Sequence, residues 1–206
     1  MNFHRLTLGE LGTNCYFIAD EETNNAIMID SPADPDIIER FLKENGYTLR
    51  YILQTHAHFD HILALGDLKE HTGAKICLHE DEAEVLRDKN INHLYTTGLD
   101  YIPPEPDMLL KDGDVIEMDG ISVKVLHTPG HTKGGACYLV GDILFSGDTL
   151  FRHTIGRTDC PTGDFDTEIK SIKEKLLPLG DNVEVYPGHG AATTIGEERK
   201  ENPYLI

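Results

Sequence analysis

Residues 55–61 read THAHFDH, and both the fold and the candidate site of this chain depend on this stretch. It lies between an apolar run, YILQ (51–54), and a helical pattern, HILALGDLKEHTG (61–73). Its side chains of the types that bind metal ions are His56, His58, Asp60 and His61. Such groups are costly to bury without partners, and side chains two apart on extended backbone point to the same side. The stretch therefore predicts a metal site where a strand becomes a helix.

Three later segments repeat one pattern: an apolar strand, then a glycine, then a histidine or an aspartate. The segments VKVLHTPG, DILFSG and VEVYPG precede His131, Asp148 and His189. Glycine allows the backbone to turn sharply and to approach other groups closely, so the next side chain is presented at the edge of a sheet. We therefore expect four strand ends to bring ligands to one place.

The candidate ligands are more numerous than the roughly three protein ligands of one catalytic zinc ion. They suit two divalent ions, with His56, His58 and His131 on one, Asp60, His61 and His189 on the other, and Asp148 between them. Zinc is the expected metal, and iron or manganese suits the same ligands. Asp60 and Asp148 are also expected to be catalytic, because they would orient the attacking water. We expect ordinary surface or core roles for His4, His71, His79, His93, His127 and His153.

Size and composition favour an ordinary globular chain. With 206 residues, 1–206 is expected to form a single domain, and the shares of hydrophobic (39%) and charged (26%) residues are typical of one. The formal net charge of −18 disfavours binding to nucleic acid or to anionic lipid. The sequence has no apolar run near the ~20 residues of a membrane helix and no secretory signal pattern. Its four scattered cysteines read as reduced thiols, so the expected location is cytoplasmic.

Strand-like and helical patterns follow one another along the chain in two similar rounds. Apolar runs predict strands at 15–20, 25–30, 51–54, 74–79, 114–118, 121–127, 136–140, 142–147 and 182–188. Helical patterns predict helices at 31–46, 61–73, 80–89 and 164–180. Residues 90–107 read as a long loop, and loops of this length are often functional. This order favours an α/β fold in which two sheets form a sandwich with helices outside.

At this point the sequence resembles the metallo-β-lactamase superfamily and, within it, the glyoxalase II-like hydrolases. The resemblance spans nearly the whole chain and rests on THAHFDH, HTPGHTKGGACY, LFSGDTLF, IGRTD and YPGHGAATTIGEERKENPYL. It implies a four-layer αββα sandwich, and it puts the family's ligands on the residues named above, in the same division. Authentic glyoxalase II enzymes contact glutathione through an additional C-terminal helical region. This sequence has no counterpart of it, so the short, single-domain bacterial type is the better match.

The activity implied by the resemblance is hydrolysis of hydroxyacyl-thiol thioesters such as lactoylglutathione by a metal-bridged hydroxide. A thiol has a pKa near ~8.5, so a thiolate leaves without a strong general acid. Arg157 is a candidate for binding a substrate carboxylate, with an ion pair to Asp159 as the alternative. Asp30 is a candidate for a hydrogen bond to a ligand histidine, with a plain turn residue as the alternative. The expected partner is a small-molecule thioester, and the chain is expected to be a monomer or a small homo-oligomer.

Two other activities remain open on the residues alone. The persulfide dioxygenases resemble the chain through THAHFDH and GRTD, and they hold one iron by two histidines and an aspartate, here His56, His131 and Asp148. Their last motif has alanine before the histidine and Asp-Tyr after it, whereas this chain has YPGHG (186–190), which favours the hydrolase. Lactone hydrolysis is the other alternative, because the same hydroxide attacks an ester.

Overall fold

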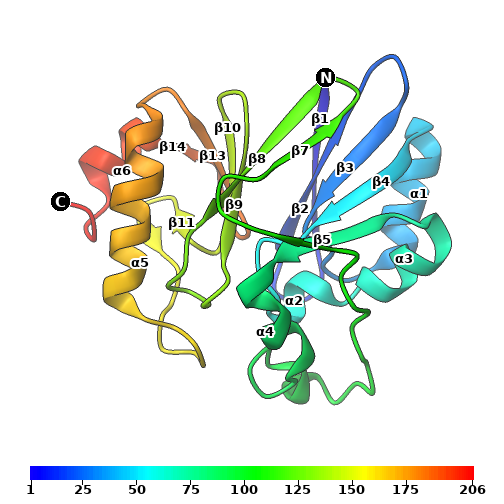
Figure 1. Cartoon of the computed structure of the whole chain (residues 1–206), viewed down its shortest axis with the longest axis horizontal. Helices are drawn as coiled ribbons and strands as arrows, with labels where there is room; N and C mark the ends of the chain where they lie inside the picture. The colour runs from blue at the N-terminus through cyan, green and yellow to red at the C-terminus, as the bar shows by residue number, and fades with distance from the viewer.

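The computed structural model describes all 206 residues, and most of its strands lie in two six-stranded sheets (Figure 1). The first sheet contains, in spatial order, β1 (Asn2–Leu8), β2 (Thr13–Ala19), β3 (Asn25–Ile29), β4 (Thr48–Leu53), β5 (Lys75–His79) and β6 (Met108–Leu110). Strands β1 to β3 pair antiparallel, and β3 to β6 pair parallel. The parallel strands β4 and β5 therefore end at the same edge of the sheet.

The second sheet is built from the later part of the chain. Its order is β14 (Thr193–Thr194), β13 (Glu184–Pro187), β10 (Ile143–Gly147), β9 (Ala136–Val140), β8 (Ile121–His127) and β7 (Val115–Met118). The pair β10 and β13 is parallel, and the other neighbours are antiparallel. A short ribbon of β11 (Leu150–Phe151) and β12 (Thr154–Ile155) follows β10. Each sheet is thus formed by one continuous portion of the chain.

Helices cover the outer faces of both sheets (Figure 1). The first portion contains α1 (Pro35–Asn45), α2 (Phe59–Ile62), α3 (Leu65–Thr72) and α4 (Ala83–Arg87), with short 3-10 turns η1 (Glu80–Glu82) and η2 (Leu94–Thr97). The second contains α5 (Phe165–Ser171), a π-helical turn η3 (Ile172–Leu176), a 3-10 turn η4 (Leu177–Leu179) and α6 (Ile195–Glu201). None of these helices combines the length and the apolarity that crossing a membrane requires.

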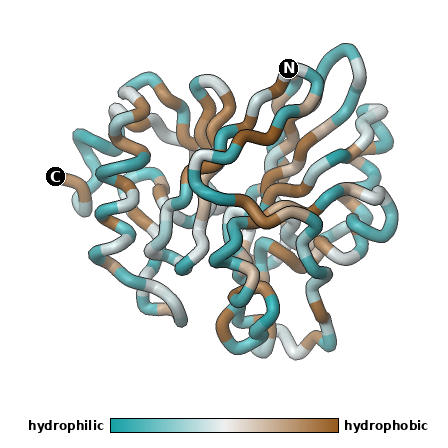
Figure 2. The backbone as a smooth tube through the Cα atoms, viewed as in Figure 1, coloured by the Kyte–Doolittle hydropathy of each residue, from teal (hydrophilic) through white to brown (hydrophobic).

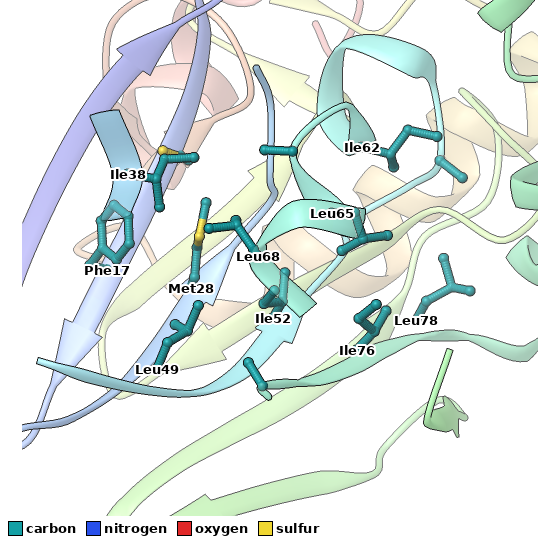
Figure 3. Close-up of a cluster of buried hydrophobic side chains, with 14 of the residues drawn as sticks. Phe17, Met28, Ile38, Leu49, Ile52, Ile62, Leu65, Leu68, Ile76 and Leu78 are labelled. Carbon is teal, nitrogen blue, oxygen red and sulfur yellow. The ribbon is translucent and has the colours of Figure 1, made fainter. Parts of the chain in front are cut away.

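Three apolar cores separate the layers. One lies between the first sheet and helices α1 and α3, and Figure 3 shows its side chains, among them Phe17, Met28 and Leu68. The core between the two sheets includes Tyr16 and Val123, and a third core lies under α5 and α6. Phe17 and Tyr16 belong to different cores because successive side chains of a strand point to opposite faces. Figure 2 shows the resulting pattern, with hydrophobic strands and hydrophilic outer loops. The expected αββα sandwich is confirmed.

Some predicted element boundaries were wrong. The helix expected at 61–73 is interrupted, because the backbone N–H of Ala64 bonds to the carbonyl groups of Ser31 and Pro32 instead of continuing one helix. The helix expected at 80–89 is a 3-10 turn followed by α4, which ends at Arg87. The one expected at 164–180 passes from α5 into π and 3-10 turns. No prediction covered β1, β6, β11, β12, β14 or α6.

Candidate metal centre

The seven predicted ligand residues meet at one edge of the sandwich. The stretch with His56 to His61 follows β4 of the first sheet. His131, Asp148 and His189 follow β8, β10 and β13 of the second sheet. The two sheets are also joined here by backbone, since the N–H of Asn14 donates to the carbonyl of Gly188 at 2.7 Å. The site is therefore built across the junction of the two sheets.

Three histidines form the first group of potential ligands. His58 Nδ1 lies 2.9 Å from His131 Nε2, and the ring of His56 lies 4.9 and 4.8 Å from those of His58 and His131. One ligand atom from each lies within 4.8 Å of the others. All three side chains are buried. This is the first of the two sets that the sequence predicts.

The second group contains Asp60, His61 and His189. Asp60 Oδ2 lies 3.5 Å from His61 Nε2 and 3.2 Å from His189 Nε2. Asp148 lies between the groups, because its Oδ1 is 3.4 Å from His61 Nε2 and its Oδ2 is 3.7 Å from His131 Nε2. The structure therefore brings together the residues of the second predicted set and places Asp148 between the two sets.

Hydrogen bonds on the outer side of the site fix the tautomers of three histidines. His61 Nδ1 donates to Asp30 Oδ2 at 2.9 Å, and His131 Nδ1 donates to the carbonyl of Arg157 at 2.7 Å. The hydroxyl of Thr55 donates to Asp30 Oδ2, so it accepts from His56 Nδ1 at 3.1 Å. In each case Nδ1 makes the outer hydrogen bond and Nε2 faces the site, as in many metal centres.

Unpaired polar atoms show that this site suits divalent metal ions. Six buried side-chain atoms have no hydrogen-bond partner, and four of them belong to predicted ligands: His56 Nε2, His58 Nε2, His61 Nε2 and Asp148 Oδ1. Buried polar atoms without partners are rare, because each one carries a desolvation cost. Imidazole nitrogens and carboxylate oxygens are donors for zinc, iron and manganese. The residues present therefore fit bound divalent metals.

Electrostatics favours the protonation states that bind metals. Burial and the neighbouring His131 lower the pKa of His58 to about 3, so its imidazole is neutral. Burial opposes the ionised form of Asp60, but His61 and His189 outweigh it and lower the pKa of this carboxyl group. His61 differs, because Asp60, Asp148 and Asp30 overcome the effect of burial and raise its pKa well above the usual value. The carboxylates of Asp60, Asp148 and Asp30 thus favour a positive charge beside or on the ring of His61.

Two glycines of the ligand loops are required by close approach. No side chain fits at Gly188, because an added Cβ would collide with Asp148 Oδ1 and would lie 2.8 Å from His61 Cε1. Gly147 has a φ of +50°, and an added Cβ would collide with Thr55. Glycine precedes these ligands because a side chain at either position would collide with the neighbouring loop.

A buried glutamate that the sequence did not reveal connects two ligand loops. The Glu82 carboxylate accepts from the N–H groups of Ala57 and Gly134, both at 2.9 Å, and from Thr132 Oγ1 at 2.8 Å. Ala57 lies between His56 and His58, and Thr132 follows His131. Burial raises the pKa of Glu82 to about 7. In the sequence it is one acid among several in a helical pattern, so no signal distinguished it.

Glu168 of α5 is a second buried glutamate near the site. Its Oε2 accepts from the backbone N–H of His131 at 2.9 Å, while its Oε1 has no partner. Burial, helped by the charge of Asp148, raises the pKa of Glu168 to about 9. The side chain is therefore a neutral acid at pH 7.

His93 is a further residue that the sequence analysis assigned to an ordinary role. Its backbone has a φ of +64°, unusual for a residue with a side chain, and its Nε2 is buried without a partner. Its ring lies 5.3 Å from that of His58. The carbonyl of Asn92 accepts from the N–H of Phe59 at 2.8 Å, which anchors this loop to the ligand stretch. His93 therefore belongs to the wall of the site.

The metal centre opens into a pocket of about 430 Å³. Arg157 lines it, but its guanidinium is paired with Asp159 at 2.8 and 3.0 Å, as in the alternative interpretation of this residue. Tyr101, in the loop at 90–107, does not line this pocket, and its hydroxyl donates to the carbonyl of Ile62 at 3.0 Å. Sandwich and site together are those of a metal-dependent enzyme whose ligand loops lie at the edges of two sheets.

Comparisons with known proteins agree with this class. The family model described as "Metallo-beta-lactamase superfamily" matches residues 8–189. The chain is 36% identical over 213 residues to a hydroxyacylglutathione hydrolase, GloC, of Haemophilus influenzae, covering 100% of this chain and 98% of that one. It is 34% identical to a probable metallo-hydrolase, YqgX, of Bacillus subtilis, covering 100% of this chain and 98% of that one. The chain belongs to the metallo-β-lactamase superfamily and is a metallo-hydrolase of it.

Solved structures show the same relationship. The B3 metallo-β-lactamase BLEG-1 superposes with a TM-score of 0.93 at 36% identity, with 99% of each chain covered. TTHA1623 in a di-iron-bound form superposes with a TM-score of 0.88 at 34% identity, covering 98% of this chain and 100% of that one. ETHE1 from Myxococcus xanthus superposes with a TM-score of 0.82 at 32% identity, covering 98% of this chain and 84% of that one.

Proposed function

We propose that this protein hydrolyses thioesters of hydroxyacyl groups by means of two divalent metal ions. The carrying observation is the convergence of seven ligand-type side chains from four strand ends, with buried donor atoms that lack any other partner. His56, His58 and His131 would hold one ion, Asp60, His61 and His189 the other, and Asp148 both. The likeness to the hydroxyacylglutathione hydrolase of Haemophilus influenzae supports the thioester substrate.

The residues of the chain prepare the site for this reaction. Divalent metals in such a centre acidify water and polarise a carbonyl group. Asp60 is fixed by the hydroxyl of Thr13, which donates to its Oδ2 at 2.8 Å, so its carboxylate orients the reacting water. Asp148, which lies between the two groups of ligands, would help to orient the same water. A thiolate is a good leaving group, so the reaction needs no strong proton donor in the pocket.

Metal content tests the binuclear site. Protein purified without chelator is expected to hold about two ions per chain, and Asp60→Ala is expected to hold about one, because it removes a ligand from only one group. Elemental analysis measures both values. An Asp181→Ala variant, altered at an exposed carboxylate outside the site, is the control and should keep the wild-type content. A single ion in wild-type protein would contradict the proposal.

The likeness to ETHE1 fits the second candidate, a mono-iron oxygenase. His56, His131 and Asp148 would then hold a single iron. Asp60→Ala should in that case keep the full metal content. Oxygen consumption in the presence of a persulfide, measured on the iron-loaded protein, would favour this function over thioester hydrolysis.

A further inference from the structure

A second pocket adjoins the metal centre and is larger. Its volume is about 670 Å³, against about 430 Å³ for the metal pocket. The two pockets share Leu11, Phe59, Asp60 and Thr96 in their walls. A substrate whose carbonyl group lies at the metals thus has room for a long arm in the second pocket, which we call the outer groove.

The outer groove is lined by apolar side chains from three separate segments. Leu11 comes from the turn between β1 and β2, Leu99 from the loop after η2, and Phe59 and Leu63 from the region of α2. Leu11 is 57% exposed and Leu99 58% exposed. Exposed apolar residues that gather at a pocket indicate a binding surface, whereas single ones are common.

The charges of the outer groove have one sign only. Its charged residues are Glu10, Asp34 and the proposed metal ligand Asp60, so its free charges are those of Glu10 and Asp34, and it contains no lysine, arginine or histidine. In the metal pocket the one basic side chain other than histidine is Arg157, which is already paired with Asp159. A carboxylate on the substrate arm would therefore find no free guanidinium or ammonium and would face like charges. Glutathione carries two carboxylates against one ammonium group, so its net charge is negative and it suits this groove poorly.

On these grounds we propose that the outer groove selects thioesters whose larger arm is apolar and carries no carboxylate. The inference rests on the proposed function and specifies its substrate class. An uncharged arm buries apolar surface against Leu11, Leu99 and Phe59 and avoids the repulsion from Glu10 and Asp34. Glutathione thioesters, in contrast, are expected to be poor substrates of this chain.

A matched pair of substrates tests the inference. S-Lactoylglutathione and its diethyl ester share one skeleton and one ammonium group, but the ester lacks both carboxylate charges. The metal-loaded enzyme is expected to hydrolyse the diester with a kcat/KM at least about tenfold higher, mainly through KM. The preference should narrow as salt is raised, because salt screens charge repulsion but not shape. Preference for the diacid would overturn the inference and leave the proposed function standing.

A charge placed in the groove provides the second test. Leu99→Lys is expected to reduce the preference for the diester several-fold, because it supplies the missing cation. Val115→Lys adds the same charge on the edge strand β7, at a residue that is 49% exposed and lines neither pocket, and should leave the preference unchanged. An equal effect of the two variants would mean that net charge, not the groove, sets the preference, and would overturn the inference.

Binding separates this inference from the proposed function. If the metal-loaded protein hydrolyses neither thioester, the proposed function fails, but the groove is still tested by non-hydrolysable thioethers. S-Hexylglutathione diethyl ester should then bind more tightly than S-hexylglutathione in calorimetry. Equal or weaker binding of the diester would overturn the inference.

Discussion

Glu82 and Glu168 are both buried beside the metal-binding loops, but their carboxylates accept different numbers of hydrogen bonds. Glu82 accepts from three donors on two loops, whereas Glu168 accepts from one and leaves Oε1 unpaired. The sequence predicted which histidines and aspartates come together, since those that follow strand ends form a visible pattern. It did not reveal these glutamates or His93, because their importance comes from tertiary contacts.

We expect Glu82→Gln to weaken zinc binding about 10–100-fold, as the loss of outer contacts to a metal site commonly does. A glutamine would turn its NH₂ group toward N–H or O–H donors and leave at least one buried donor unpaired, at ~1–3 kcal/mol. Competition with a chromophoric chelator measures the zinc affinity, and circular dichroism checks that the variant folds.

The matched control is Glu168→Gln, which should keep its zinc affinity within about twofold of wild type. Because the pKa of Glu168 is raised from 4.5 to about 9, the native side chain is neutral at pH 7, and an amide resembles it. The stability linked to this proton is present below pH 4.5 and is lost as the pH rises through about 9. The variant should therefore lose less stability than wild type over this range. Equal zinc affinities of the two glutamine variants would count against this account.

At the scale of elements, the sequence predicted long apolar strands well and short or interrupted elements poorly. Strands β6 and β14 have three and two residues, which is too short for a periodic pattern. The break between α2 and α3 follows from hydrogen bonds to Ser31 and Pro32, which lie far away in sequence. The loop at 90–107 is anchored in the same way, by the Tyr101 hydroxyl, which accepts from the N–H of Gly66 and donates to Ile62.

Tyr101→Phe should therefore lower the free energy of unfolding by ~1–2 kcal/mol, because the carbonyl of Ile62 and the N–H of Gly66 lose their partner. The ring itself remains to pack. Denaturant titration measures the loss, and limited proteolysis should show faster cleavage within residues 90–107. Tyr95→Phe, at an exposed tyrosine of the same loop, is the control. A Tyr101→Phe variant as stable as Tyr95→Phe would show that these two hydrogen bonds do not anchor the loop.

At the scale of the whole molecule, the two sheets meet at the metal centre. Bound cations would be shared ligands for side chains of both sheets. They would contact the carboxylates beside His61 and the nitrogens of His58 and His131 that face each other. Metal at about 100 times its Kd would stabilise the fold by ~2.7 kcal/mol, so chelation should lower the Tm by about 5–10 °C. Thermal unfolding followed by circular dichroism, with and without chelator, measures the shift. Chelation should lower the Tm of the Asp60→Ala variant by less than that of the wild type. An unchanged Tm in the wild-type protein would show that metal does not link the two sheets.

The separation of the two sheets along the chain has one more consequence. A cut within residues 111–114 would leave every strand of the first sheet on one fragment and every strand of the second on the other. The first fragment would keep His56, His58, Asp60 and His61, and the second His131, Asp148 and His189. Each of the two predicted metal sets takes two residues from the first fragment and one from the second. Neither fragment contains a complete set. Binding of two metal ions would therefore indicate that the two fragments have associated.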